Sequence, residues 1–200
     1  MTSEISIILL AAGSSSRMGQ SKQLLKVEGE PLLLRSSKVA VGSGAGRLVV
    51  VLGADKEVHQ EIIKDLPLTV VYNPHWKKGM GNSLKVGLKQ VLKMAPGTEA
   101  VLVMVCDQPR LTPQYLIDLI QQYNTTKSKI VASAYSGTVG VPALFDKSFF
   151  QELLLVEDEQ GAKKILDRHS DSIRTVDFSG GEIDLDTLED FQTFIQKTKP

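Results

Sequence analysis

Two hydrophobic patterns alternate along the chain: short continuous apolar runs, and segments whose apolar residues recur at helical spacing. The runs are typical of strands buried on both faces of a parallel sheet, and the spaced segments of amphipathic helices. The pattern predicts strands at residues 5–11, 47–52, 68–72, 100–105, 129–134 and 172–176. It predicts helices at residues 32–41, 56–64, 82–94, 113–123, 145–154 and 161–168, and a last helix from Asp186 or Thr187 through Phe194.

Up to about residue 123, predicted strands and helices alternate, as they do in parallel sheets that carry helices on both faces. Pro31 stands where a helix can begin, and Thr112 precedes a proline at the first helical position. The alternation then loosens, and residues 137–141 form a stretch broken by glycine. We therefore predict an α/β fold, a three-layer sandwich around a mostly parallel central sheet.

Composition narrows the function classes. The 200 residues suit a single domain, and the hydrophobic fraction of 42% supports a sizeable core. The 23 basic and 23 acidic residues cancel, which argues against a broad charged surface for nucleic acid or an anionic membrane. Cys106, the single cysteine, cannot form an internal disulfide, which fits a reducing compartment. Without a membrane-length apolar run or secretion signal, we expect a cytoplasmic protein without nucleic-acid or membrane partners.

Residues 9–22, with the sequence L-L-A-A-G-S-S-S-R-M-G-Q-S-K, carry the most chemical information. A buried strand ends here in small residues that let a backbone close around an anion, while Arg17 and Lys22 add two cations. Five residues separate Gly13 from Gly19, so neither the P-loop nor the dinucleotide-binding pattern is met. We interpret the segment as a triphosphate-binding loop; the alternative is an ordinary surface turn.

Carboxylates mark two further positions. Asp107 directly follows the apolar strand at residues 100–105, where a hard cation and a phosphate chain could meet; the alternative is a simple turn before Pro109. Asp184 and Asp186 alternate, so they face the same way on an extended segment. A helix cap at Thr187 leaves these two aspartates unexplained.

A third strand-to-helix junction contains Gly79, Asn82 and Ser83, which offer close backbone approach and hydrogen-bonding groups at a helix N-terminus. An ordinary helix cap explains them equally well from sequence alone. We interpret Trp76 as a packing residue and Cys106 as a small buried hydrophobe. The histidines His59, His75 and His169 show no metal-ligand spacing, and we interpret them as surface residues.

Together, these segments resemble the motifs of nucleotidyltransferases related to the molybdenum cofactor guanylyltransferases. Their pattern L-A-[AG]-G-x-S-x-R-M-G-x-x-K is matched by Leu10, Ala11, Ala12, Gly13, Ser15, Arg17, Met18, Gly19 and Lys22. Residues 184–190 show the D-x-D form of the cytidylyltransferases rather than the N-x-N form of the guanylyltransferases, with Leu188 replacing a proline. Residues 140–145 resemble the G-x-P-x-L-F motif. Residues 158–163 resemble G-D-x-G-A-R, with Lys163 replacing the arginine.

The chain is thus similar to the molybdenum cofactor cytidylyltransferases, within the MobA-like nucleotidyltransferase family. The resemblance implies a Rossmann-like nucleotide-diphospho-sugar transferase fold, with a nucleotide-binding half at about residues 1–110 and an acceptor-binding half at about 111–200. It implies catalytic roles for Arg17, Lys22 and Asp107, and metal binding by Asp107, Asp184 and Asp186. Gln108, Gly140 and Pro142 would contact the acceptor. Nucleotide contacts are implied for Leu10, Ala11, Ala12, Gly13, Ser14, Ser15, Arg17, Lys22, Gly79, Asn82 and Ser83.

The implied reaction transfers CMP from CTP to the phosphate of molybdenum-bound molybdopterin and releases pyrophosphate. Mg²⁺ is the implied metal, and Mn²⁺ also suits oxygen ligands. The cytosine dinucleotide serves client proteins of the xanthine dehydrogenase type. Three alternatives stay open: guanylyl transfer to the same cofactor, transfer to a sugar or polyol phosphate, and a non-catalytic nucleotide-binding partner of a molybdoenzyme.

Overall fold

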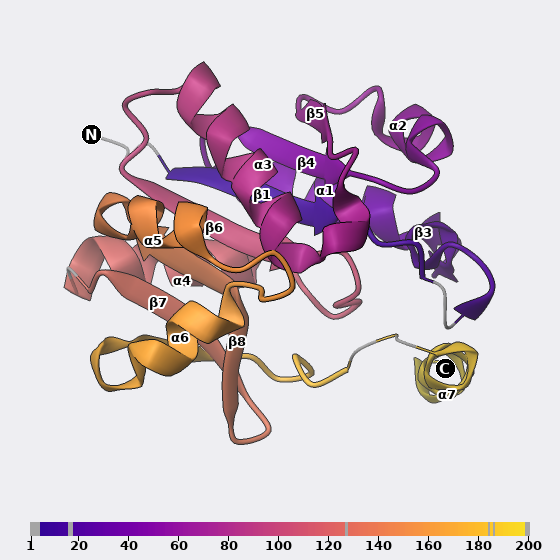
Figure 1. The fold of residues 1–200 in the computed structure, drawn as a ribbon. Helices are drawn as coiled ribbons and strands as arrows, with labels where there is room; N and C mark the ends of the chain where they lie inside the picture. The colour runs from indigo at the N-terminus through magenta and orange to yellow at the C-terminus, as the bar shows by residue number, and fades with distance from the viewer. Residues whose placement is uncertain (1–4, 16–17, 127, 184, 186, 199–200) are drawn as a thin grey trace.

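The protein is built around a seven-stranded sheet with the strand order β5-β4-β1-β6-β8-β7-β9 (Figure 1). The computed structural model describes residues 5–15, 18–126, 128–183, 185 and 187–198. All neighbouring strands of the sheet pair in parallel except where β8 meets β6 and β7. The strands are β1 (Ile5–Ala11), β4 (Leu48–Leu52), β5 (Thr69–Tyr72), β6 (Ala100–Val105), β7 (Ile130–Tyr135), β8 (Thr138–Asp146) and β9 (Arg174–Asp177).

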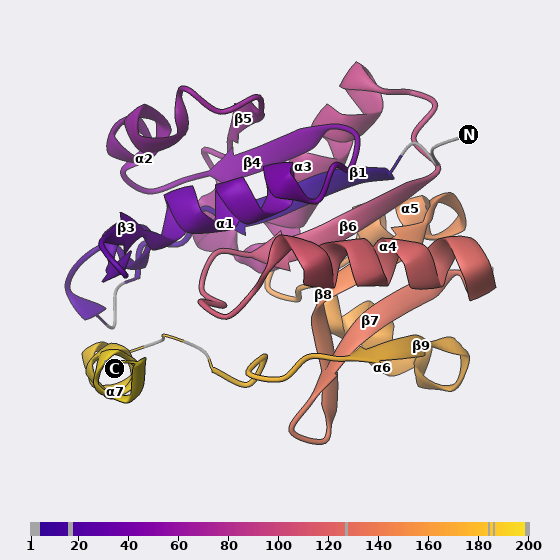
Figure 2. The same cartoon turned by 180° about the vertical axis from the view of Figure 1, so that it is seen from behind.

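Helices cover both faces of the sheet, which confirms the predicted α/β three-layer class (Figures 1 and 2). One face carries α1 (Leu32–Gly42), α2 (Lys56–Ile63) and α4 (Pro113–Thr126). The other carries α3 (Met80–Met94), α5 (Phe150–Leu155) and α6 (Lys163–Arg168). Short 3₁₀ turns lie at Lys22–Leu24, Trp76–Lys78, Lys147–Phe149 and Ser170–Ser172.

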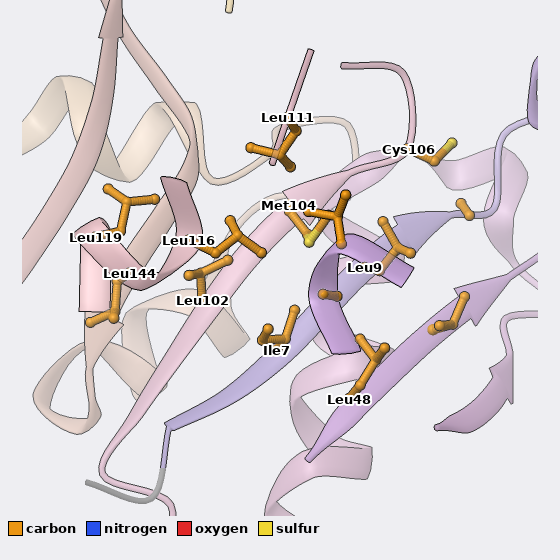
Figure 3. Close-up of a cluster of buried hydrophobic side chains, with 14 of the residues drawn as sticks. Ile7, Leu9, Leu48, Leu102, Met104, Cys106, Leu111, Leu116, Leu119 and Leu144 are labelled. Atoms are coloured by element: carbon orange, nitrogen blue, oxygen red, sulfur yellow. The ribbon is translucent and has the colours of Figure 1, made fainter. Parts of the chain in front are cut away.

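The two cores form because successive residues of a strand point to opposite faces of the sheet. Ile7 and Leu9 of β1 face α1 and α4, together with Leu102 and Met104 of β6 (Figure 3). Burying each such side chain stabilises the fold by roughly 1.5–3 kcal/mol. Cys106 belongs to the same cluster and is 5% exposed, which confirms its interpretation as a buried small hydrophobe.

The last helix, α7 (Leu188–Thr198), packs apart from these two layers. It lies beside a small hairpin of β2 (Lys26–Val27) and β3 (Glu30–Pro31) that the sequence pattern did not predict (Figure 1). A third buried cluster joins them, formed by Met18, Leu25, Val27, Leu32, Leu185 and Phe194. Leu185, which precedes α7, therefore packs in one cluster with Met18 of the loop that follows β1.

One predicted helix, residues 145–154, is wrong at its start. Phe145 and Asp146 belong instead to β8, where the fully buried Phe145 lies opposite Val101 of β6. The glycine-broken stretch at 137–141 is the start of the same strand. Ser136 and Gly137 form a two-residue turn with φ of 46° and 74°, which is the backbone that closes a tight hairpin. The helix α5 begins only at Phe150, after a 3₁₀ turn.

Smaller differences concern element boundaries. The helix α3 begins at Met80 rather than Asn82, and β9 begins at Arg174 rather than at residue 172. The last helix begins at Leu188. Thr187 caps it, because its hydroxyl accepts a hydrogen bond from the Asp190 backbone N–H. Among the described residues, no helix is both long and apolar enough to cross a membrane.

Candidate nucleotide site

A cavity of about 380 Å³ opens at the carboxyl ends of β1 and β6. The chain runs outward from β1 to β4 and β5 on one side, while β6 lies on the other, so this is a switch point of the sheet. Ligands of open α/β sheets bind at such points. The predicted residues that line the cavity are Leu10, Ala11, Ala12, Gly13, Ser14, Ser15, Lys22, Gly79, Ser83 and Asp107.

The loop after β1, residues 12–22, is called the signature loop below. The Gln23 amide, just beyond it, donates to the backbone carbonyls of Ala11 at 3.0 Å and Gly13 at 2.8 Å. The Ser15 hydroxyl accepts a hydrogen bond from the Lys22 backbone N–H at 2.8 Å. Ser15 has a φ of 52°, in the left-handed region that few side chains adopt. These contacts curve the loop around the cavity.

Lys22 and Asp107 meet across the cavity, although 85 positions separate them in sequence. The ammonium nitrogen of Lys22 lies 3.0 Å from Oδ2 of Asp107. Their side chains are only 11% and 23% exposed, so the pair is less screened than a surface ion pair. The pair thus brings a cation and a carboxylate together at the cavity, where β1 and β6 end.

The loop between β4 and α2 supports the signature loop from behind. The Ala54 backbone N–H donates to the Ala12 carbonyl at 3.2 Å. A Cβ on Gly53 would lie 2.3 Å from that same oxygen and 2.7 Å from the Trp76 side chain. Only glycine allows this approach. Trp76 packs against the core as predicted, and it also lines the cavity.

At the N-terminus of α3, Ser83 and Asn82 have different surroundings. The Ser83 hydroxyl accepts a hydrogen bond from the amide of the fully buried Asn73 at 3.0 Å and lines the cavity. The Asn82 amide donates instead to Oδ1 of Asp158, also at 3.0 Å, and Asn82 is not among the lining residues. The structure therefore brings Ser83, but not Asn82, to the cavity.

Residues 156–161 wrap around this helix start, and glycines allow the close contact. A Cβ on Gly81 would lie 2.1 Å from the Glu157 carbonyl oxygen and 2.2 Å from that of Gln160. The ammonium group of Lys85 also bonds Asp158. Hydrogen bonds from Lys85 and from Asn82 hold the pKa of Asp158 below its ordinary value. Residues 156–161, which belong to the predicted acceptor-binding half, thus contact a helix of the predicted nucleotide-binding half.

The three predicted acceptor residues lie beside the cavity rather than on its lining. The Gln108 amide donates to the Val141 carbonyl at 2.9 Å, which links the Asp107 turn to β8. The Pro142 carbonyl accepts a hydrogen bond from Ser133, and the Tyr135 hydroxyl fills the space where a Cβ on Gly140 would lie. Gln108 is thus attached to the strand that carries Gly140 and Pro142, and all three residues are buried.

Three predicted site residues, Arg17, Asp184 and Asp186, lie outside the described residues. Leu185 is fully buried in the cluster that also contains Met18 of the signature loop. Within the described ranges, no group of three His, Cys, Asp or Glu side chains is arranged to hold a metal ion. Asp107 is the predicted metal ligand that the structure places in the cavity.

Several cavity residues were not predicted from sequence as site residues. They are Gln23, Trp76, Lys77, Met80, Val105 and Cys106. Four of them are neighbours of predicted site residues in the sequence, and this position could have suggested that they line the cavity: Lys77, Met80, Val105 and Cys106. Gln23 gave no signal, because its role depends on reaching back to Ala11 and Gly13.

The interpretation of His59 as a surface residue is wrong. His59 lies on α2, is fully buried, and its Nε2 atom lies 2.7 Å from the Ser21 hydroxyl. Burial lowers the pKa of its imidazole, while the Asp55 carboxylate and the Ala54 backbone oppose this shift. Most residues of α2 are polar, so the sequence does not show that His59 lies on the buried side of this helix, together with Ile63.

Comparisons with known proteins find relatives that span nearly the whole chain. The chain is 26% identical over 197 residues to the purine catabolism protein PucB of Bacillus subtilis, covering 92% of each chain. It is 28% identical over 196 residues to the molybdenum cofactor cytidylyltransferase of Escherichia coli, covering 96% of this chain and 95% of the relative. These two names differ, so similarity at this level does not fix a substrate.

Solved structures show the same arrangement of elements. The crystal structure of Rv0371c from Mycobacterium tuberculosis H37Rv has a TM-score of 0.83 and 26% identity, covering 98% of this chain and 99% of that one. The complex of that protein with manganese has a TM-score of 0.80 and 25% identity, covering 98% and 100%.

The family model of the MobA-like NTP transferase domain matches residues 7–173. This span includes the signature loop, Asp107 and the start of α3, and it confirms the family resemblance drawn from the motifs. The chain therefore belongs to the family of MobA-like NTP transferase domains.

Proposed function

We propose that this protein transfers CMP from CTP to the terminal phosphate of molybdenum-bound molybdopterin, forming the cytosine dinucleotide and pyrophosphate. One observation carries the proposal: the signature loop, Lys22 and Asp107 line a single cavity at the switch point of the sheet. In this proposal residues 1–110 form the nucleotide-binding half and residues 111–200 the acceptor-binding half of one domain.

Electrostatics supports triphosphate binding at the signature loop. Backbone N–H groups of a small-residue loop form a concave anion site, and Gly13, Ser14 and Ser15 line the cavity. The Lys22 ammonium group adds a mobile point charge. A triphosphate that enters the cavity gives this ammonium group a second anionic partner beside Asp107. Arg17 belongs to the same proposal through the family motif.

The donor set fits a divalent cation. Mg²⁺ binds through one or two carboxylates together with substrate phosphates, and Asp107 supplies a carboxylate at the cavity. Asp184 and Asp186 are the further proposed ligands. When bound, Mg²⁺ or Mn²⁺ would neutralise charge on the phosphate oxygens.

The bond changes need few protein groups. An oxygen of the acceptor phosphate forms a bond to the α-phosphorus, and the bond from that phosphorus to the bridging oxygen of pyrophosphate breaks. A phosphate monoester is largely ionised near neutral pH, so no general base is required. The residues of this chain therefore act by positioning and by charge: Lys22 holds the phosphates, and Gln108, Gly140 and Pro142 belong to the acceptor side.

Two features favour CTP over GTP. Residues 184–190 have the D-x-D form found in cytidylyltransferases, and the Escherichia coli relative named a cytidylyltransferase covers nearly the whole chain. The proposed product then passes to a molybdoenzyme of the xanthine dehydrogenase type. Guanylyl transfer and transfer to a sugar or polyol phosphate are outcomes that the following experiment separates.

The test incubates the purified protein with CTP or GTP, Mg²⁺ and molybdenum-loaded molybdopterin. Pyrophosphate release is measured, and the dinucleotide is identified by mass spectrometry. We expect product with CTP and little with GTP. Product with GTP alone would overturn the base assignment, and no product with either would overturn the acceptor assignment.

Variants link the activity to the cavity. Asp107→Ala should abolish turnover with the fold intact, because the metal loses a carboxylate. Lys22→Ala should weaken CTP binding at least tenfold, since a hydrogen bond to a charged group contributes about 1.5–3 kcal/mol. Lys89→Ala, which removes an exposed lysine of α3, is the matched control and should behave like the wild type. Full activity of Asp107→Ala would refute the metal assignment.

A further inference from the structure

His59 is fully buried on a helix that does not line the nucleotide cavity. Its imidazole Nε2 lies 2.7 Å from the hydroxyl of Ser21, a residue of the signature loop. The Ser21 hydroxyl donates to Oε1 of Gln23 at 2.9 Å. A chain of hydrogen bonds thus runs from α2 to the base of the signature loop.

The direction of each hydrogen bond follows from the chemistry of Gln23. Its amide nitrogen faces two carbonyl oxygens, those of Ala11 and Gly13, and must donate to both. Its Oε1 therefore accepts, and the hydroxyls of Ser21 and Ser15 both donate to it. With its proton directed at Gln23, the Ser21 oxygen can accept from His59, and on this basis we assign the proton of the neutral imidazole to Nε2.

The relay ends on backbone that forms the nucleotide cavity. The carbonyls of Ala11 and Gly13 flank Ala12, and all three residues line the cavity. The Ser15 hydroxyl also donates to Gln23 Oε1, at 3.2 Å, and accepts from the Lys22 backbone N–H. Both ends of the loop are thereby attached to one buried amide.

A second contact ties the same helix region to the loop. The Ala54 backbone N–H, just before α2, donates to the Ala12 carbonyl. His59 and Ala54 therefore hold the signature loop at two different points.

We propose that His59 is a positioning residue of the nucleotide site: through Ser21 and Gln23, it holds the signature loop in the shape that receives the triphosphate. This inference rests on the proposed function, because it assigns the loop to nucleotide binding. His59 itself touches no substrate in this proposal.

The test measures CTP binding by titration calorimetry and, separately, KM for CTP, kcat and Tm. His59→Leu removes the donor but keeps an apolar body, and Ser21→Ala breaks the relay at its middle. Each should weaken CTP binding and raise KM for CTP about tenfold, the effect of about one lost hydrogen bond, with a smaller change in kcat. His59→Gln, whose amide N–H can replace Nε2–H, should recover most of the affinity.

Two further variants separate positioning from stability. Ile63→Val trims a fully buried side chain of the same helix and should lower Tm without changing KM for CTP. The double variant His59→Leu with Ser21→Ala should bind CTP no more weakly than either single variant, because both break one relay. If His59→Leu does not fold, the test relies on Ser21→Ala, because Ser21 is only half-buried and its replacement disturbs the core less.

The outcomes are distinct. A lower Tm with unchanged CTP binding in both single variants would overturn the positioning role and leave the nucleotide site standing. Additive losses in the double variant would also overturn the relay. A wild-type protein that binds neither CTP nor GTP would overturn the proposed function and, with it, this inference.

Discussion

Adding one methyl group at Gly81 tests how tightly residues 157–160 fit against the start of α3. A Cβ there would lie 2.1 Å from the Glu157 carbonyl oxygen and 2.2 Å from that of Gln160. Both obstacles are backbone atoms, so no flexible side chain can move aside. The same segment supplies the Asp158 carbonyl and carboxylate that bond Asn82.

The magnitudes decide the sign of the effect. Alanine is favoured over glycine inside a helix by about 1 kcal/mol. An ordinary contact between carbon and a carbonyl oxygen is about 3.3 Å, so the two carbonyls must retreat by roughly 1 Å. Such overpacking costs about 1–3 kcal/mol, and the retreat weakens the two Asn82 hydrogen bonds by about 1 kcal/mol in all. The cost exceeds the helical gain, and we expect Gly81→Ala to lose about 2 kcal/mol of stability.

The assay is thermal unfolding followed by circular dichroism. For a chain of this length, a loss of about 2 kcal/mol lowers Tm by about 4–8 °C. CTP binding should weaken too, because Gly79, Met80 and Ser83 on the displaced turn line the cavity. Gly13→Ala is the control for stability: a Cβ there meets nothing within 4 Å, and Tm should not change. A Gly81→Ala protein at least as stable as the wild type would refute the reasoning.

Two further predictions concern charged groups. Burial lowers the pKa of His59 below its ordinary value of 6.5, so the unfolded chain binds a proton more readily than the folded protein does. The free energy of unfolding should therefore fall as the pH drops through 6.5. The fall should be smaller in His59→Gln, which lacks this titrating group. Denaturant titrations at several pH values measure this, and identical profiles for the two proteins would contradict it. Asp158→Asn should raise KM for CTP by weakening the contact with Lys85, whereas Glu159→Gln, at an exposed neighbour, should leave KM unchanged. Equal KM values for both variants, measured by steady-state kinetics, would show that the contact does not support the nucleotide site.

The first half of the fold could be predicted because its signals are local. Continuous apolar runs such as residues 100–105 become strands buried on both faces, and their order fixes a parallel sheet. The same locality placed Lys22 and Asp107 at strand ends that meet in one cavity. The helix predicted from residue 145 is wrong at its first two residues for the opposite reason. The short apolar run there fits a helix or a strand, and pairing with β6 decides between them.

The parts of the site that escaped prediction depend on partners distant in sequence. Asn82 stands at a helix N-terminus that suggests a ligand contact, yet its amide is taken by Asp158, 76 positions later. His59 belongs to a largely polar helix and reaches Ser21, 38 positions earlier. No spacing rule connects such pairs. They follow from the way that the helices pack against the sheet.

The measurement that tests the central claim most directly is a crystal structure with a non-hydrolysable CTP analogue and Mn²⁺, located by its anomalous scattering. We predict the triphosphate against the signature loop and Lys22, with Mn²⁺ bound to Asp107 and the cytosine toward Ser83. A second cavity of about 530 Å³, lined by residues that include Ser43, Arg47 and Thr98, lies at the start of β1. An analogue bound there, or Mn²⁺ away from Asp107, would contradict the account.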